Sequence, residues 1–223
     1  MTMRDSPFSV GEWYHCYNHS IEGREAFTDS KDYFRFLELL YLANDESPLR
    51  RDDLGVRTFE EILTTHRGKP LVAISAFCLM PDNFHLVLHE VVEGGITSFM
   101  RKVGTAYTLY FNSRHKRIGN LFLKPFRSRH VPADRAVQNL ISYVHAHPAV
   151  LYELKWSTHH IVDPQYLEEH LTAYPYSSLG LHTGTRTLSS PILGGQKPGA
   201  WRSVPLQRML QEARRYSAES GIA

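Results

Sequence analysis

Residues 71–90 read LVAISAFCLMPDNFHLVLHE, and this stretch decides the fold. From Leu71 to Leu79 the sequence is a continuous β-type run, which Pro81-Asp82 interrupts. Apolar and polar residues then alternate from Phe84 to Glu90, before a turn at Glu93-Gly94-Gly95. The pattern predicts a tight hairpin of two strands that is central in a sheet.

The segments around the hairpin alternate between strand and helix patterns. Apolar residues recur at helical spacing in residues 32–43, 96–111 and 132–147. Strands are predicted at residues 13–21 and 121–131, the second as an edge strand. The order strand, helix, strand, strand, helix, strand, helix predicts an α+β fold, a split βαβ antiparallel sheet with helices on one face.

The chain is expected to form one main domain with additions. We assign residues 1–180 to this domain, with the polar residues 44–70 as an inserted loop. Residues 180–199 are rich in Gly, Ser, Thr and Pro, which is typical of a flexible linker. Because residues 206–216 predict a short basic helix, residues 181–223 are expected to be a flexible linker with a C-terminal helix or tail.

The composition is that of a globular protein. Of the 223 residues, 42% are hydrophobic and 12% aromatic, which is enough to bury a core. The longest apolar run, residues 71–80, is about half of the ~20 residues that a membrane helix needs, so no membrane partner is expected. The N-terminus lacks the apolar segment of a secretory signal, and Cys16 and Cys78 indicate no disulfide framework. These features predict a cytoplasmic location.

The charged residues are unevenly distributed. The formal net charge is only +2, but residues 101–131 contain no Asp or Glu. Such a segment is expected to bind a polyanion by neutralising its phosphates. The candidate phosphate-binding residues are the eight Lys and Arg side chains of this segment: Arg101, Lys102, Arg114, Lys116, Arg117, Lys124, Arg127 and Arg129. A solvated surface is the alternative, and it is the better account for any single lysine.

Asn83 and His85 have the spacing of a pair that can hold one cation. On an extended strand the two side chains share a face, about 6–7 Å apart at a rise of ~3.3 Å per residue. His89 faces the same way but lies about 13 Å from His85, too far to share an ion. Alternatively, Asn83 caps the turn at Pro81-Asp82 and His85 is a hydrogen-bonded sheet residue. Taken alone, the motif favours this alternative.

Tyr143 and His147 are four residues apart in a helical pattern. This spacing stacks them on one face, with Cβ atoms roughly 5–6 Å apart, so a nucleophile would stand beside a third ligand. In the alternative, Tyr143 is a half-buried packing residue and His147 is a cation that faces the C-terminal dipole of the helix. Pro148 also loosens the last turn around His147, because a residue before proline disfavours the α region.

Five runs of sequence carry a resemblance to a known family. In order they are Tyr14-His-Cys-Tyr-Asn18 with Asp32-Tyr33, Cys78-Leu-Met-Pro-Asp-Asn-Phe-His85-Leu, Tyr110-Phe-Asn112 with Gly119-Asn-Leu-Phe122, Tyr143-Val-His-Ala-His147-Pro148, and Tyr174-Pro-Tyr-Ser-Ser178. On these runs, which span residues 13–178, the chain resembles the single-tyrosine HUH transposases of insertion sequences. Within that family it is most similar to the REP-associated tyrosine transposases, which act on short palindromic repeats.

The resemblance implies a ferredoxin-like sheet, the HUH endonuclease fold, with the tyrosine on a helix opposite two metal ligands. By position, Tyr143 would be the catalytic tyrosine, His85 the second motif histidine and His147 the third ligand of Mg²⁺ or Mn²⁺. The first motif histidine falls on Asn83, whose amide is a weaker ligand but offers a hard oxygen that these ions accept. Relatives commonly have an asparagine where His147 stands, so we hypothesise that this chain has exchanged one His and one Asn between the two positions.

The implied activity is metal-dependent nicking and strand transfer of single-stranded DNA at hairpin or palindromic elements. It would proceed through a 5′-phosphotyrosine intermediate, as in DNA transposition and recombination. The basic residues of the 101–131 segment would bind the DNA. The best-known members of the family act as dimers that exchange the tyrosine helix, so a homodimer is also implied, although the REP-associated branch need not form one.

Two other functions stay open. In the first, the Asn83 change marks a loss of chemistry, and the domain is a domesticated protein that binds DNA or RNA hairpins. In the second, the chain is a metal hydrolase that acts on a small phosphate. The hydrolase is the weaker alternative, because it leaves the long basic segment unexplained.

Overall fold

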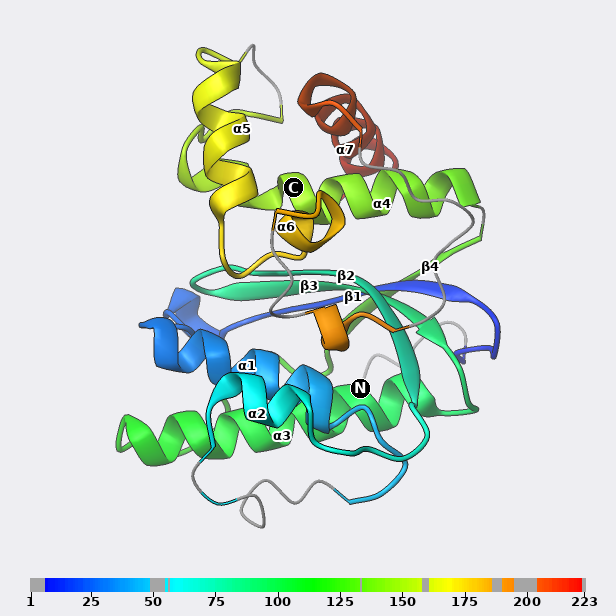
Figure 1. Ribbon diagram of the computed structural model, residues 1–223, viewed down its shortest axis with the longest axis vertical. Coiled ribbons are helices and arrows are strands. Elements are labelled where there is room, and N and C mark those ends of the chain that lie inside the picture. Colours follow the sequence, from blue (N-terminus) through cyan, green and yellow to red (C-terminus); the bar gives the residue numbers. More distant parts are fainter. Residues whose placement is uncertain are drawn as a thin grey trace.

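A four-stranded antiparallel sheet lies in the middle of the protein, between two layers of helices (Figure 1). The computed structural model describes residues 7–48, 55, 57–132, 134–157, 161–185, 190–194 and 204–221. The strand order is β2-β3-β1-β4, with the strands β1 (Trp13–His19), β2 (Val72–Leu79), β3 (Asn83–Glu90) and β4 (Arg127–Val131). The predicted α+β class with a split βαβ antiparallel sheet is confirmed.

The hairpin predicted from residues 71–90 forms β2 and β3, with Leu79 paired with Phe84 across the turn. β3 is an interior strand, as predicted, because β1 pairs with its other side. β2 is an edge strand, so the prediction of a central position is wrong for β2. Later segments cover its outer side, which satisfies backbone groups that an open edge would expose. The backbone bonds run from Leu79 N to Tyr176 O (2.9 Å), from Ser178 N to Phe77 O (2.9 Å) and from Gly194 N to Ile74 O (3.0 Å).

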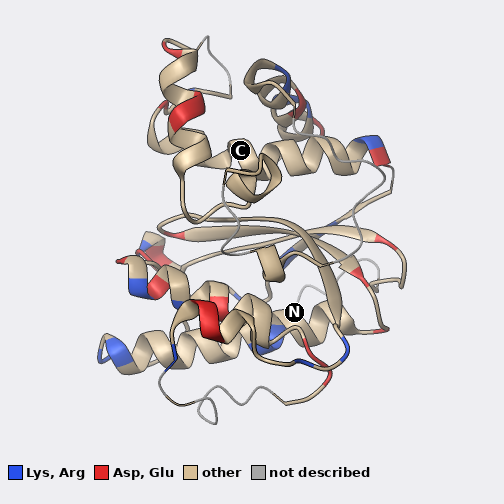
Figure 2. Cartoon of the chain, viewed as in Figure 1, with Lys and Arg blue, Asp and Glu red and all other residues tan. Residues whose placement is uncertain are grey.

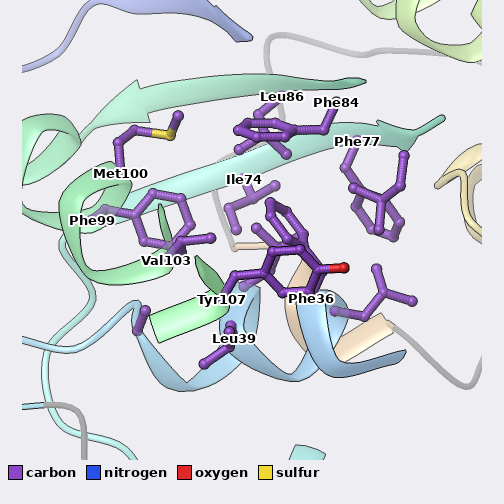
Figure 3. Close-up of a cluster of buried hydrophobic side chains, with 14 of the residues drawn as sticks. Phe36, Leu39, Ile74, Phe77, Phe84, Leu86, Phe99, Met100, Val103 and Tyr107 are labelled. Atoms are coloured by element: carbon purple, nitrogen blue, oxygen red, sulfur yellow. The ribbon is translucent and has the colours of Figure 1, made fainter. Parts of the chain in front are cut away.

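One face of the sheet is covered by α1 (Ser30–Leu42) and α3 (Gly95–Arg114), with α2 (Phe59–Leu63) beside α1 (Figure 1). Asp29 begins α1, because its carboxylate accepts hydrogen bonds from the first backbone N–H groups of the helix. Large side chains from α1, α3, β2 and β3 interdigitate between helices and sheet (Figure 3). This core includes Phe36, Leu39, Ile74, Phe77, Phe84, Leu86, Phe99, Val103 and Tyr107.

The later helices lie on the opposite side of the sheet (Figure 1). They are α4 (Asp134–Ala146), α5 (Pro164–Ala173), α6 (Leu179–His182) and α7 (Leu206–Ser220). The chain also contains the short 3-10 turns η1 (Ile21–Gly23), η3 (His147–Leu151) and η4 (Ser190–Ile192). The prediction of helices on one face therefore holds for α1 and α3 but is wrong for these helices. The physical reason is that the strands also point apolar side chains such as Ala76 and Val87 to the second face, where α4 covers them.

The short helix predicted at residues 206–216 is present as α7, and it packs against the rest of the protein. It lies along α4, and the Ser142 hydroxyl of α4 donates a 2.7 Å hydrogen bond to the Glu212 carboxylate of α7. Its apolar face is buried, with Leu206, Met209, Leu210, Ala213 and Tyr216 in the core. The helical pattern in the sequence did not indicate a partner, because a pattern of this length does not specify which surface it covers.

Parts of two predicted segments lie outside the described residues, namely 49–54 and 56 of the inserted loop and 186–189 and 195–203 of the linker. The beginning of the inserted loop is anchored to the sheet. There the Asn44 side chain accepts from the backbone of Leu71 and Val72 and donates to Val72 O at 2.8 Å. Within the described ranges, no helix combines the length and the apolar character needed to cross a membrane.

Leu210→Ala tests whether α7 is an integral part of the fold. Leu210 is 1% exposed, so its truncation is expected to lower the free energy of unfolding by about 2–4 kcal/mol, measured by urea denaturation. Gln211→Ala, at an exposed position of the same helix, is the matched control and is expected to change stability by no more than about 0.5 kcal/mol. Equal effects of the two substitutions would contradict the packing of α7.

Candidate active site

The β3 strand sorts its side chains between the two layers of the protein. Phe84, Leu86 and Leu88 point into the core formed with α1 and α3. Asn83 and His85 therefore point to the other face, toward α4, because successive residues of a strand alternate. Both are buried, His85 at 1% exposure.

The structure brings Tyr143 and His147 to His85. Tyr143 lies near the end of α4, and His147 is the first residue of the 3-10 turn η3, where Pro148 follows it. The ring centroids of His85 and His147 are 4.2 Å apart, those of His85 and Tyr143 are 5.7 Å apart, and those of Tyr143 and His147 are 5.4 Å apart. The change to 3-10 geometry before Pro148 does not separate the pair, so three residues singled out in the sequence form one cluster.

Asn83 lies on the same face of β3 as His85, and its amide oxygen is buried. The Asn83 side-chain nitrogen donates to the Asp82 carboxylate at 2.7 Å, which leaves the oxygen Oδ1 free of that contact. Asn83 Oδ1 and His85 Nε2 are both buried, and neither has a hydrogen-bond partner in the part of the chain that the structure describes. Buried polar atoms without partners are costly and rare, so both positions call for an explanation.

Asn83 Oδ1, His85 Nε2 and the His147 imidazole are the kinds of ligand that a divalent cation takes. Among the described residues, no three His, Cys, Asp or Glu side chains are grouped closely enough to hold a metal ion. A metal site here therefore needs the amide of Asn83 in addition to the imidazoles of His85 and His147. An amide oxygen and neutral imidazoles are ligands that Mn²⁺ accepts, and the amide oxygen also suits Mg²⁺.

Three residues of β1 that the sequence reasoning did not assign to the site also line it. In the antiparallel pairing, Tyr17 lies opposite His85 and His19 lies opposite Asn83, so these side chains share a face. The rings of Tyr17 and His85 stack at 5.4 Å, and those of His15 and His85 at 5.1 Å. The available signal was the alternation in Trp13–His19, which places His15, Tyr17 and His19 on one face of a strand.

The histidines of the site are neutral at physiological pH. Burial lowers the pKa of His15 to about 3, with a smaller contribution in the same direction from His147. Burial also lowers the pKa of His147 to about 4, with a smaller contribution in the same direction from His19. Burial, followed by the nearby histidines, also lowers the pKa of His85 well below its ordinary value. Neutral imidazole is the form that binds metal ions, so these rings are ready to act as ligands over a wide pH range.

Tyr143 is a buried phenol in this structure. It is 2% exposed, and burial raises the pKa of its hydroxyl far above the ordinary value. Tyr216 of α7 packs against it, with ring centroids 5.3 Å apart. His19, Asp82 and His147 are only partly buried, so they mark the side on which solvent reaches the cluster.

The candidate phosphate-binding residues do not form one surface. Figure 2 shows Lys and Arg on both sides of the sheet. Arg101 and Lys102 lie on α3, on the face opposite Tyr143, and the Lys102 ammonium donates to Ser47 O at 2.7 Å. Arg117 donates to the Asn112 side chain at 3.1 Å. Lys116 and Lys124 are exposed in the segment between α3 and β4.

Arg114 is held by acids of α1. It donates to the carboxylates of Asp29 and Asp32, at 2.7 Å for the Asp29 contact through Nη1, and the Asp32 side chain is fully buried. Its hydrogen bonds to these two carboxylates raise the pKa of Arg114. This guanidinium therefore joins α3 to α1, and its charge is neutralised within the protein.

Arg127 and Arg129 are the two basic residues of the segment that lie beside the site. They lie on the edge strand β4, paired with Tyr17 and His15, so their side chains point to the same face as the site. Both are exposed, and Arg129 donates to Glu219 O of α7 at 2.9 Å. A nucleic acid that reached Tyr143 along this edge would meet these two guanidinium groups.

Comparison with known proteins supports the fold. Neither a family model nor a curated protein matches the chain. Among solved structures, the chain is similar to a REP-associated tyrosine transposase bound to a REP hairpin, with 12% sequence identity and a TM-score of 0.52. The match covers 90% of this chain and 95% of that chain. At this identity the likeness shows the fold alone.

The Arg114→Ala variant tests whether Arg114 stabilises the fold through its ion pairs with Asp29 and Asp32. Because the buried Asp32 carboxylate would lose its guanidinium partner, we expect the free energy of unfolding to fall by about 1–3 kcal/mol in urea denaturation. Arg101→Ala, at an exposed position of the same helix, should change it by no more than about 0.5 kcal/mol. Equal unfolding midpoints for the two variants would show that the Asp32 pairing contributes nothing.

Proposed function

We propose that this protein is a metal-dependent single-tyrosine endonuclease that nicks and rejoins single-stranded DNA at hairpin elements, as in DNA transposition. One observation carries the proposal. The phenol of Tyr143 lies beside two imidazoles and an amide, and two of their buried acceptor atoms, His85 Nε2 and Asn83 Oδ1, lack partners among the described residues. A nucleophile next to a set of hard and borderline ligands is the arrangement that phosphodiester transfer requires.

The chemistry assigned to Tyr143 is an in-line attack on the scissile phosphate. The phenolic oxygen forms a bond to phosphorus, the bond from phosphorus to the 3′ oxygen breaks, and the products are a 5′-phosphotyrosine and a free 3′ hydroxyl. A divalent ion held by Asn83, His85 and His147 would polarise the phosphate. Since burial raises the pKa of Tyr143, the phenol must lose its proton as the new bond forms, and the leaving 3′ oxygen gains one. The covalent link conserves the phosphodiester energy, so rejoining needs no nucleotide.

Two features support hairpin DNA as the substrate. The chain is similar, over 90% of its length, to a solved structure of a REP-associated tyrosine transposase bound to a REP hairpin. In this chain, Arg127 and Arg129 line the edge of the sheet next to the site, where they can neutralise phosphates of a bound strand.

A hairpin-binding protein without cleavage activity is the second candidate. The amide of Asn83 stands where the resemblance implies a histidine, and Tyr143 is almost fully buried next to Tyr216. Both features favour a weakened or inactive site. The basic edge at Arg127 and Arg129 would serve this function equally well.

Tyr143→Phe tests the nucleophile. The parent protein, incubated with a single-stranded hairpin oligonucleotide and Mn²⁺ or Mg²⁺, is expected to form a covalent protein–DNA adduct visible on a denaturing gel. Tyr143→Phe should abolish the adduct, because it removes only the attacking oxygen. Tyr107→Phe is the matched control: its hydroxyl bonds to Ala26 O on the other side of the sheet, so its adduct yield should equal that of the parent.

Other outcomes of the same assay separate the candidate functions. Salt-sensitive binding to the hairpin without any adduct, over a set of hairpin sequences, would favour the binding protein. An adduct that persists in Tyr143→Phe would show that another residue is the nucleophile.

Variants of Asn83 test whether the proposed ligand set of Asn83, His85 and His147 supports cleavage. Asn83→Ala is expected to lower adduct yield at least about 10-fold, because the amide oxygen is one of three proposed ligands. Asn83→His should shift the metal preference from Mg²⁺ toward Mn²⁺ more than it changes the yield, since imidazole suits the softer ion better. An Asn83→Ala variant that cleaves as well as the parent would exclude the amide as a ligand.

A further inference from the structure

A hydrogen-bonded chain of three buried side chains connects the C-terminal helix to the candidate metal ligand His85. His85 Nδ1 lies 2.9 Å from His15 Nε2, and His15 Nδ1 lies 2.9 Å from the hydroxyl oxygen of Tyr216. Tyr216, His15 and His85 are 4%, 0% and 1% exposed. The chain therefore runs from α7 through β1 to β3, shielded from water along its length.

The protons of this chain can be arranged in two directions. In the first, Tyr216 donates to His15 Nδ1, His15 Nε2 donates to His85 Nδ1, and the proton of neutral His85 is on Nε2. In the second, His85 Nδ1 donates to His15 Nε2, His15 Nδ1 donates to the Tyr216 oxygen, and His85 Nε2 keeps a lone pair. Both arrangements contain the same number of protons, because the Tyr216 hydroxyl turns its own proton away in the second.

Only the second direction is compatible with a cation at His85 Nε2. This atom is buried and has no hydrogen-bond partner within the described residues, so in the first direction it would be a buried N–H group without an acceptor. An N–H group there would also repel a cation. In the second direction Nε2 is an acceptor, as the oxygen of Asn83 is, and the metal site of the proposed function would use both atoms.

We propose that Tyr216 and His15 are positioning residues that hold His85 in its Nδ1–H tautomer and thereby keep Nε2 free to bind a divalent ion. The inference rests on the metal site of the proposed function and adds two residues to it. Ligating histidines ordinarily donate their second ring N–H to a fixed acceptor, which sets the tautomer and the orientation of the ring. Here the acceptor is another imidazole, and a tyrosine of the last helix sets its tautomer in turn.

This arrangement assigns a role to α7 in the site without any contact to the ion. Tyr216 is held in place because α7 packs along α4 and because Glu212, one turn earlier, accepts from Ser142. The C-terminal helix would therefore influence metal affinity through two hydrogen bonds, over a sequence separation of 201 residues between His15 and Tyr216.

Tyr216→Phe is the direct test. It removes the acceptor for His15 Nδ1–H, so His15 is expected to carry its proton on Nε2, donate it to His85 Nδ1, and leave the proton of His85 on Nε2. In metal-free protein labelled with ¹⁵N-histidine, NMR should show His85 protonated at Nδ1 in the parent and at Nε2 in the variant. The dissociation constant for Mn²⁺, from calorimetry or from the EPR signal of free Mn²⁺, should rise about 10-fold.

Two further variants separate positioning from a general loss of packing. Tyr174→Phe also loses one buried hydrogen bond, from its hydroxyl to Leu79 O, but it does not touch the chain and should keep the Mn²⁺ affinity of the parent. His15→Gln can accept from His85 Nδ1 and donate to Tyr216 with its amide, so it should bind Mn²⁺ more tightly than His15→Leu. His15→Leu should lose at least as much affinity as Tyr216→Phe.

The outcomes distinguish this inference from the function on which it rests. If Tyr216→Phe keeps both the Nδ1–H tautomer and the parent's Mn²⁺ affinity, while His85→Ala abolishes Mn²⁺ binding, the positioning role is wrong and the metal site stands. If the parent and His85→Ala are equally unable to bind Mn²⁺, the metal site itself is wrong, and the positioning role falls with it.

Discussion

The candidate site depends on the alternation of side chains along β3. Phe84, Leu86 and Leu88 are fully packed into the core against α1 and α3, so the strand cannot slip by one residue without bringing polar groups into that core. This constraint fixes Asn83 and His85 on the opposite face, beneath α4. An apolar core on one side of the sheet thus holds a polar cluster in register on the other.

The polar cluster is built from neutral groups. Burial lowers the pKa of His15, His85 and His147, and it raises the pKa of Tyr143 and Tyr216, so each group is stabilised in its uncharged form. Imidazole and phenol groups can be buried together at moderate cost when they bond to one another, as a row of carboxylates could not. The same neutrality leaves lone pairs available for a cation, and it leaves the phenol of Tyr143 with its proton.

The distribution of charge along the chain gave only partial guidance to the distribution of charge in space. Residues 101–131 contain no acid, but Asp29 and Asp32 lie at the start of α1, which packs against α3. Both carboxylates form ion pairs with Arg114. The tertiary structure thus removes part of the predicted basic surface. Arg127 and Arg129 remain beside the site, because β4 pairs with β1 at the edge of the sheet.

The sequence by itself determined the elements and the local pairings within them. The hairpin of residues 71–90, the shared face of Asn83 and His85, and the spacing of Tyr143 and His147 all follow from backbone periods of two and 3.6 residues, which act between near neighbours. Only the tertiary structure decided that these two pairs meet, that the outer face of the sheet is covered by further helices, and that α7 packs along α4. His15 and Tyr216, 201 residues apart, are the clearest example, since no local pattern specifies a contact that depends on how β1, α4 and α7 pack together.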